Sequence, residues 1–216
     1  MAIKLNGILR NSTVAEQSQD IIGAWHMANN PEIFEPQRVN NFMLLVHGLD
    51  NIVRPGMTAD ETAGTIPGAE QALTLSVTKA FIPHFTQDPI AVQVGNTTIN
   101  FAGVPKFGSG TVTVNDWIGT NSKEILMAWQ ALSGNLTTQK VGLASDYKKE
   151  ATLIEYTPDW QRVRSWNLHG CWVSGLSEDD YDNEGSGKKT ITATIVYDYG
   201  EIDQTETGQG ATTVTV

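Results

Sequence analysis

The sequence predicts a mainly β protein with a short flanking helix. Three consecutive segments, Ser145–Glu155, Arg162–Val173 and Lys189–Tyr199, have the composition of strands and are separated by turn-rich gaps. A helix with one apolar face is predicted directly upstream, over Asn121–Ser133. This stretch contains sheet-building residues and no catalytic constellation, which indicates a structural or binding protein rather than an enzyme.

Composition narrows the class of protein further. The 216 residues suffice for one domain with a real core, and an apolar share of 40% with six Trp indicates a folded chain. The net charge is −10, from 24 acids and 14 bases. Attraction to phosphates needs clustered Lys and Arg, so this balance disfavours ordinary nucleic-acid binding. It remains compatible with a surface past which DNA moves without sticking.

We expect a single domain with an N-terminal extension and long loop over residues 1–70. Thr13–Ala28 is predicted to be a helix, and Phe42–His47 a buried strand. Asp50–Glu70 contains Gly, Pro, Thr and acids without periodicity, which predicts a loop with a contact role. The core is expected over residues 71–202, followed by a tail over 203–216.

The first strands of the core are predicted from alternation and turn chemistry. Leu73–Phe81 alternates apolar residues with Thr and Ser, and Thr111–Asn115 does the same. Ile90–Val94 and Thr97–Phe101 flank the two-residue turn Gly95-Asn96, which predicts a hairpin.

The predicted helix has a cap at Asn121, with Glu124 as its partner, and Gly134 ends it. Its apolar side chains recur at helical spacing and are expected in the core together with two strand tryptophans. The expected core set is Ile125, Trp129, Leu132, Trp166 and Trp172. Cys171 is alone and lies in an apolar strand, so we expect a small buried side chain.

The strands carry small, uncharged residues on the faces opposite their apolar residues. In Lys189–Tyr199 that face holds Thr190, Thr192 and Thr194. Two explanations stay open. Thr simply favours strands, or these faces meet other subunits or line a smooth inner wall.

Metal and catalytic motifs are incomplete. Asp180, Asp182 and Glu184 resemble the start of a calcium loop, but Ile191 stands where the bidentate Glu is needed. An acidic solvated turn is the favoured interpretation. The four histidines show no metal-ligand spacing, and no phosphate-binding or nucleophile motif is present. We therefore predict no catalytic residue, cofactor or metal ligand.

A small basic cluster is predicted from Lys148, Lys149, Arg162 and Arg164. It could bind the acidic Glu178–Glu184 loop of a neighbouring subunit. Equally, it could be strand-edge charge that discourages mispairing.

Several strands together resemble a known family. Tyr147–Leu153, Val163–Trp172 and Ile191–Tyr199 match its strand motifs in order and spacing, and Val92–Asn100 matches its hairpin. The chain resembles the tail tube proteins of contractile-tailed bacteriophages of the T-even type, over about Leu73–Ile202.

The resemblance implies a β-sandwich or barrel of antiparallel strands with one flanking α-helix. The helical N-terminal extension is an elaboration on it. It implies that six copies form a ring and that rings stack into a tube through which DNA passes without specific binding. Implied partners are the tail sheath, the baseplate and the tape-measure protein, with assembly in the host cytoplasm and no membrane insertion. Joined sheet edges and an acidic lumen that repels DNA are further hypotheses.

The expected intersubunit residues combine strand faces, the long loop and the basic cluster. They are Thr74, Ser76, Thr78, Thr190, Thr192, Thr194, Asp50, Asp60, Glu61, Lys148, Lys149, Arg162 and Arg164. Other hypotheses are a tube subunit of a related contractile injection or secretion system and a monomeric β-sandwich binding module. A metal-dependent hydrolase using Asp180–Glu184 is the least favoured.

Overall fold

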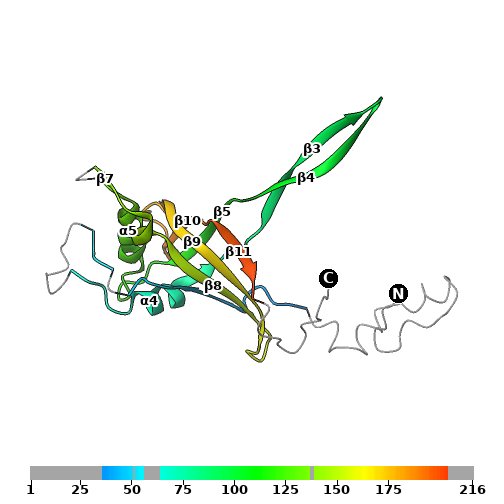
Figure 1. Ribbon diagram of the computed structural model, residues 1–216. Helices are drawn as coiled ribbons and strands as arrows, with labels where there is room; N and C mark the ends of the chain where they lie inside the picture. The colour runs from blue at the N-terminus through cyan, green and yellow to red at the C-terminus, as the bar shows by residue number, and fades with distance from the viewer. Residues whose placement is uncertain (1–35, 51, 56–63, 137–138, 204–216) are drawn as a thin grey trace, which may run out of the picture. The chain divides into compact units, whose positions relative to one another are not determined.

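The computed structural model describes residues 36–50, 52–55, 64–136 and 139–203 (Figure 1). The described helices and strands lie in the unit Asn40–Val216. The predicted helix Thr13–Ala28, the loop residues Asp60 and Glu61 and the tail beyond Asp203 lie outside the described residues.

A curled antiparallel sheet forms the centre of the fold, in the order β1-β8-β9-β10-β5-β2, with β11 paired to β9. Its strands are β1 (Phe42–Val46), β2 (Val77–Lys79), β5 (Ser109–Asn115), β8 (Lys149–Tyr156), β9 (Arg162–Glu178), β10 (Thr190–Val196) and β11 (Tyr199–Ile202). All the pairings are antiparallel. The predicted mainly β fold class is confirmed.

Strand β9 bends, and the bend curls the sheet. Its first half pairs with β8 and β11, whereas its second half pairs with β10. Gly170 lies between these halves with φ +69°, a conformation that glycine adopts without steric cost. Opposite it, the backbone N–H of Asp198 donates to the carbonyl of His169 at 2.9 Å. The strand predicted over Lys189–Tyr199 is present as β10, which ends at Val196, and β11 is a further strand that begins at Tyr199.

Helix α4 (Ala69–Ser76) takes the first part of the strand predicted over Leu73–Phe81, and β2 is the only stretch of that prediction that forms a strand. The strand prediction was wrong because the buried residues Ala69, Leu73 and Ser76 follow helical spacing. Leu75, which alternation assigned to the core, is 72% exposed. The hydroxyl of Ser76 donates to the Ala72 carbonyl at 2.7 Å, a local bond typical of a helical serine.

Helix α6 (Ala144–Tyr147) occupies the start of the strand predicted over Ser145–Glu155, so β8 begins four residues later than expected. The backbone N–H of Lys148 closes the helical turn on the Ala144 carbonyl at 3.0 Å. Three helices, α4, α5 and α6, are thus present in the part of the chain that the structure describes, where the sequence predicted one.

Helix α5 (Ser122–Ser133) is the predicted amphipathic helix, and Asn121 and Gly134 are its end residues as expected. The proposed capping chemistry was wrong. Asn121 adopts φ +53° and makes no side-chain cap bond, and Glu124 instead pairs with Arg54, at 2.8 Å. No helix within the described ranges is long and apolar enough to cross a bilayer.

The core lies between one face of the sheet and helices α4 and α5. Ile125 and Trp129 are fully buried in it, while Leu132 and Trp166 are partly buried against it. Trp172 was expected in the core but is only half-buried, edge-on to Tyr147 with 5.9 Å between ring centroids. The apolar alternation predicted for β10 is confirmed, because its buried residues are Ile191, Ala193 and Ile195. Cys171 is buried as expected.

Two hairpins lie outside this sheet. One is the predicted hairpin, formed by β3 (Phe85–Val94) and β4 (Thr97–Phe107), and it is longer than expected. Its turn contains Gly95 at φ +60°, as the turn type requires. The other pairs β6 (Gly134–Asn135) with β7 (Lys140–Val141) beside the end of α5. The β3–β4 hairpin projects away from the curled sheet (Figure 1).

Candidate assembly interface

The β3–β4 hairpin has one apolar face. Its register pairs Ile90 with Phe101 and Val92 with Ile99, and Val94 follows on the same side. Strand side chains alternate between faces, so these five residues share one face, which we call the hairpin face. The opposite face carries Ala91, Gln93, Thr98 and Asn100.

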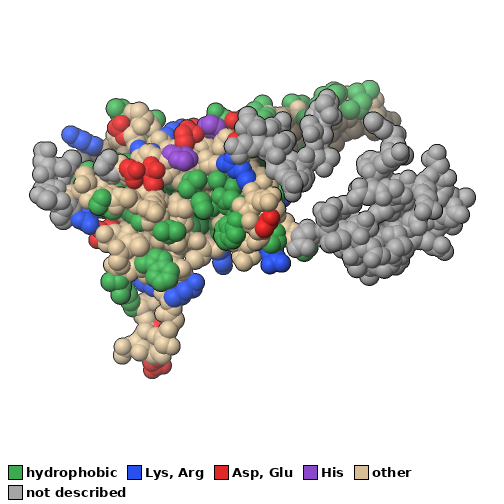
Figure 2. Space-filling model, turned by 90° about the horizontal axis from the view of Figure 1, so that it is seen from below, with side chains coloured by type: hydrophobic (Ala, Val, Ile, Leu, Met, Phe, Trp, Pro, Cys, Tyr) green, Lys and Arg blue, Asp and Glu red, His purple; other side chains and the backbone are tan. Residues whose placement is uncertain are grey.

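The hairpin face is exposed in the described structure. Its five side chains are between 43% and 55% exposed. No charged residue occurs from Pro89 to Pro105, although the chain as a whole carries a net charge of −10. Hydrophobic side chains can be followed along the projecting hairpin in the space-filling view (Figure 2). A contiguous exposed apolar face marks an interaction surface, and an isolated two-stranded ribbon is only marginally stable in water.

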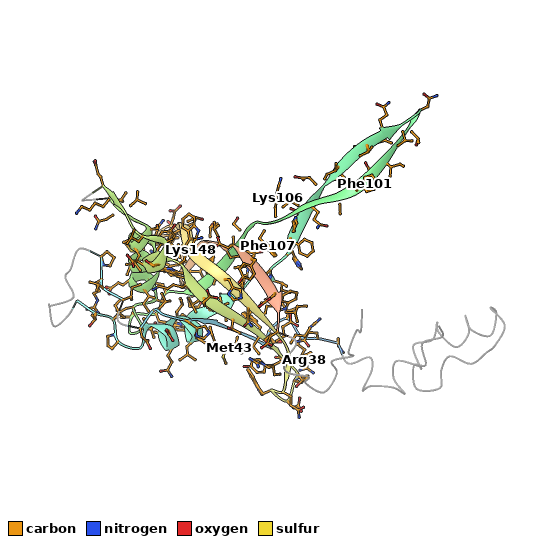
Figure 3. All side chains as sticks on the ribbon, in the orientation of Figure 1. Arg38, Met43, Phe101, Lys106, Phe107 and Lys148 are labelled. Atoms are coloured by element: carbon orange, nitrogen blue, oxygen red, sulfur yellow. The ribbon has the colours of Figure 1, made fainter. Side chains whose placement is uncertain are left out.

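The base of the hairpin is fixed to the sheet by aromatic packing. Tyr197 stacks on Phe81 with 5.3 Å between centroids and meets Phe107 edge-on at 5.8 Å. Lys106 Nζ pairs with a carboxylate oxygen of Asp88 at 2.5 Å, and Figure 3 shows where Lys106 and Phe107 leave the sheet. Burial raises the pKa of the Tyr197 phenol above its ordinary value. The hairpin is therefore anchored to the sheet at its base.

The curled sheet ends in strands that can accept further pairing. β1 forms one border, and β2 forms the other, where it pairs with β5 only around Val114 and Thr113. Unpaired strand borders present backbone donors and acceptors to any other strand. Both borders are therefore candidate contact sites.

The threonines of β10 share one face of the sheet. Thr190, Thr192 and Thr194 are half-buried on the side of β10 opposite the core. Thr113 and Thr192 approach with 3.4 Å between their hydroxyl oxygens, and the Thr78 hydroxyl donates to the Thr113 carbonyl at 3.0 Å. Thr74 and Ser76 lie apart from this face, because both belong to α4. Whether the face meets another subunit or lines a wall stays a prediction.

The predicted basic cluster is two separate sites. Lys149 lies at the first residue of β8, whereas Arg162 pairs with Tyr156 at its last residue. Lys148 binds the Asp198 carboxylate at 2.7 and 2.9 Å, and this hydrogen bond raises the pKa of the lysine. At the far end, Arg164 Nη2 pairs with Glu155 at 2.8 Å. The expectation of one cluster was wrong because the two lysines and the two arginines lie at opposite ends of the β8–β9 strand pair. Asp50 is exposed in the turn region after β1.

The acidic segment between β9 and β10 is an exposed loop, as predicted. Glu178 at its start accepts from Lys123 at 2.8 Å and lies 2.9 Å from Lys189. The hydrogen bond from Lys123, followed by that from Lys189, lowers the pKa of Glu178. Lys189 Nζ also lies 3.8 Å from the centroid of the Tyr181 ring. Within the described ranges, no group of three or more His, Cys, Asp or Glu is placed to hold a metal ion.

His169 joins three strands in a way that its sequence position did not reveal. Its Nδ1 lies 2.6 Å from the Glu150 carboxylate on β8, and its Nε2 lies 3.5 Å from that of Glu201 on β11. Its ring stacks on Tyr199 with 4.3 Å between centroids. These contacts attach β11 to β9. They depend on a long-range pairing that no local motif indicates.

A second feature missed by sequence reasoning is an open groove of about 740 Å³ beside α5, which we call the α5 groove. It is bounded by one side of α5, by β6, by residues 53–55 and by Ser174 of β9. Its lining residues are Val53, Arg54, Pro55, Met127, Ala128, Gln130, Ala131, Leu132, Ser133, Gly134, Asn135, Leu136 and Ser174. Arg54 is the charged member of this lining, and it is engaged by Glu124.

Comparison with known proteins identifies relatives in phage tails. No protein-family model matches the chain. The tail tube protein gp19 of Enterobacteria phage T4 is 27% identical over 136 residues, which are 61% of this chain and 82% of that protein. The tail tube protein gp19 of Enterobacteria phage T6 matches to the same extent.

Solved structures give the same fold. The sheath-tube complex of the extracellular contractile injection system PVC contains a chain with a TM-score of 0.54 at 13% identity, covering 81% of this chain and 96% of that one. The tube-terminating cap of the anti-feeding prophage gives 0.53 at 14% identity, covering 78% and 91%. The resemblance to the tail tube proteins of contractile-tailed phages is thus confirmed, and the chain has the β-rich half-barrel fold of tail tube proteins.

Proposed function

We propose that this protein is the structural subunit of a phage tail tube, in which hexameric rings stack around a channel that conducts DNA. The sequence relatives are tail tube proteins, and the structural neighbours come from tubes and caps of contractile injection systems. The proposal includes no catalytic role and a location in the virion tail.

The observation that carries the proposal is the hairpin face. Five apolar side chains project from the sheet on a charge-free ribbon and have large exposed fractions. A second copy of the chain is the occupant that the tube proposal requires for this face. The open borders at β1 and β2 supply further contacts between neighbouring copies in a ring.

The threonine face and the exposed acids complete the proposal. Thr78, Thr192 and Thr194 offer an uncharged, half-buried surface, suited either to subunit contact or to the channel wall. A net charge of −10 suits a conduit in which DNA is repelled rather than bound. Sheath, baseplate and tape-measure proteins are the proposed partners. Structures with a similar fold include a chain from a sheath-tube complex and a chain from a baseplate.

The experiment compares two lysine substitutions on neighbouring residues of the hairpin. Val92→Lys places a charge on the hairpin face, and Gln93→Lys places the same charge on the opposite face. We expect wild type and Gln93→Lys to form rings or tubes in negative-stain microscopy, and Val92→Lys to remain monomeric with an unchanged melting temperature.

A monodisperse wild-type monomer would overturn the tube proposal and favour a β-sandwich binding module. The conduit part has a separate test. Assembled tubes should not retain duplex DNA on a filter at physiological salt, and strong retention would contradict a non-adhesive channel.

A related contractile injection system is the second candidate, because the structural neighbours with TM-scores above 0.5 belong to such systems. The two candidates share the tube and differ in cargo. Mass spectrometry of purified virions would distinguish them, since the phage candidate requires this chain in particles that contain DNA.

A further inference from the structure

We propose that the hairpin face of one copy docks into the α5 groove of a second copy. The inference rests on the proposed function, and it names the surface that receives the hairpin in the assembled tube. The groove and the hairpin belong to different parts of the fold, and nothing in the sequence pattern connects them.

The first argument is that neither surface presents an unpaired charge. The ribbon from Pro89 to Pro105 contains no ionisable side chain. In the groove lining, Arg54 is charged, and its Nε is held 2.8 Å from the Glu124 carboxylate. Burying a charge without a partner is costly, and interface centres are depleted of charged residues. In this acidic chain the two surfaces can therefore meet without burying a charge that lacks a partner.

The second argument is the exposed apolar rim of the groove. Met127 is 40% exposed on α5, and Leu136 after β6 is 95% exposed. Val141 on β7 pairs with the lining residue Gly134 and is 84% exposed. Methionine is flexible and polarizable, so it adapts to the shape of an incoming side chain. These residues gain burial when β-branched and aromatic side chains of the hairpin cover them.

The third argument is that the hairpin does not reach the groove of its own chain. The hairpin is fixed at its base by packing of Phe81 and Phe107 on Tyr197. From there it projects away from α5 and β7 (Figures 1 and 3). A hairpin that occupies this groove therefore comes from another copy. A contact between two different surfaces of identical chains is head-to-tail and repeats, which produces rings or open filaments.

The test is cross-linking of the full-length assembled protein in a Cys171→Ala background. Val92→Cys and Met127→Cys are introduced together and treated with a short bismaleimide linker, and each single variant serves as control. We expect a ladder of covalent multimers with the double variant, and at most dimers with either single variant. A double variant that assembles but gives no more multimer than the single variants would overturn the docking site, while the tube proposal would stand.

A charge placed in the groove gives an independent readout. Met127→Glu should abolish multimers and leave the melting temperature of the monomer unchanged, because the side chain already contacts solvent. Met127→Leu, which keeps the apolar volume, should assemble as wild type. Normal assembly of Met127→Glu would contradict the inference, whereas failure of the wild-type protein to assemble would contradict the proposed function itself.

Discussion

Truncation of Trp129 gives the sharpest test of the core. The side chain is fully buried on α5, and its indole N–H donates to the Tyr147 carbonyl at 2.9 Å. Trp129→Ala removes the ring from a packed interior, a change that costs about 3–5 kcal/mol. The Tyr147 carbonyl also loses its partner, which adds about 1–3 kcal/mol where water cannot replace the bond.

These losses are comparable to the whole stability of a typical domain, about 5–15 kcal/mol. We therefore expect little soluble Trp129→Ala protein. Trp129→Phe keeps most of the apolar contact but loses the hydrogen bond, so its cost should be smaller, about 1–3 kcal/mol. For a chain of this size each kcal/mol lowers the melting temperature by about 2–4 °C.

The assay is thermal unfolding followed by circular dichroism, together with the yield of soluble protein. Trp160→Ala is the matched control, because Trp160 is 65% exposed in the turn after β8 and its removal leaves no internal cavity. A Trp129→Ala protein with wild-type yield and melting temperature would refute the assignment of this ring to the core. A Trp160→Ala protein that unfolds as readily would show that the assay does not separate buried from exposed tryptophans.

Three further predictions concern the bend, the acidic loop and the thiol. Gly170→Ala should destabilise the monomer by at least about 1–2 kcal/mol, because φ is +69° and a Cβ would overlap the Asp198 carboxylate. Gly175→Ala is the control and should destabilise the monomer less, because there is open space beside Gly175. Equal melting temperatures for the two variants would contradict this account. Glu178→Gln should lower stability at pH 7 and lower it less at pH 3. Because the pKa of Glu178 is lowered in the folded protein, its ionised carboxylate stabilises the fold above the ordinary pKa of 4.5, and this stabilisation is lost as the pH falls through the pKa of the folded state. Chemical denaturation of both proteins at the two pH values measures the difference in unfolding free energy. A difference that does not change with pH would contradict the prediction. Cys171 should react with a thiol reagent at pH 8 only after unfolding in guanidinium, because burial raises its pKa to about 12; rapid labelling of the native protein would disprove its burial.

The strands that were predicted correctly are those in which neighbouring residues of the sequence specify the strand partner or the buried face. Gly95-Asn96 specifies a two-residue turn, and the residues on either side pair around it as expected. In β10 the alternation of Ile191, Ala193 and Ile195 with threonines has period two over a full strand. Both signals arise from neighbouring residues and need no knowledge of the rest of the chain.

The segment around α4 shows why a local pattern can mislead. Over a few residues, Leu73 and Val77 fit a strand face and a helix face equally well, since a spacing of four satisfies both periods. Packing of α4 beside β1 and α5 decided for the helix, because it buries Ala69, Leu73 and Ser76 together.

The sequence by itself determined the mainly β fold, the central helix and the resemblance to tail tube proteins. Each of these follows from side-chain periodicity and from motif order along the chain. Only the tertiary structure decided that Lys148 and Arg164 lie at opposite ends of the β8–β9 strand pair, that His169 attaches β11, and that a groove whose charged residue Arg54 is already paired lies beside α5. These features depend on strand register and on the bend at Gly170, which bring distant residues together through many weak contacts distributed over the whole chain.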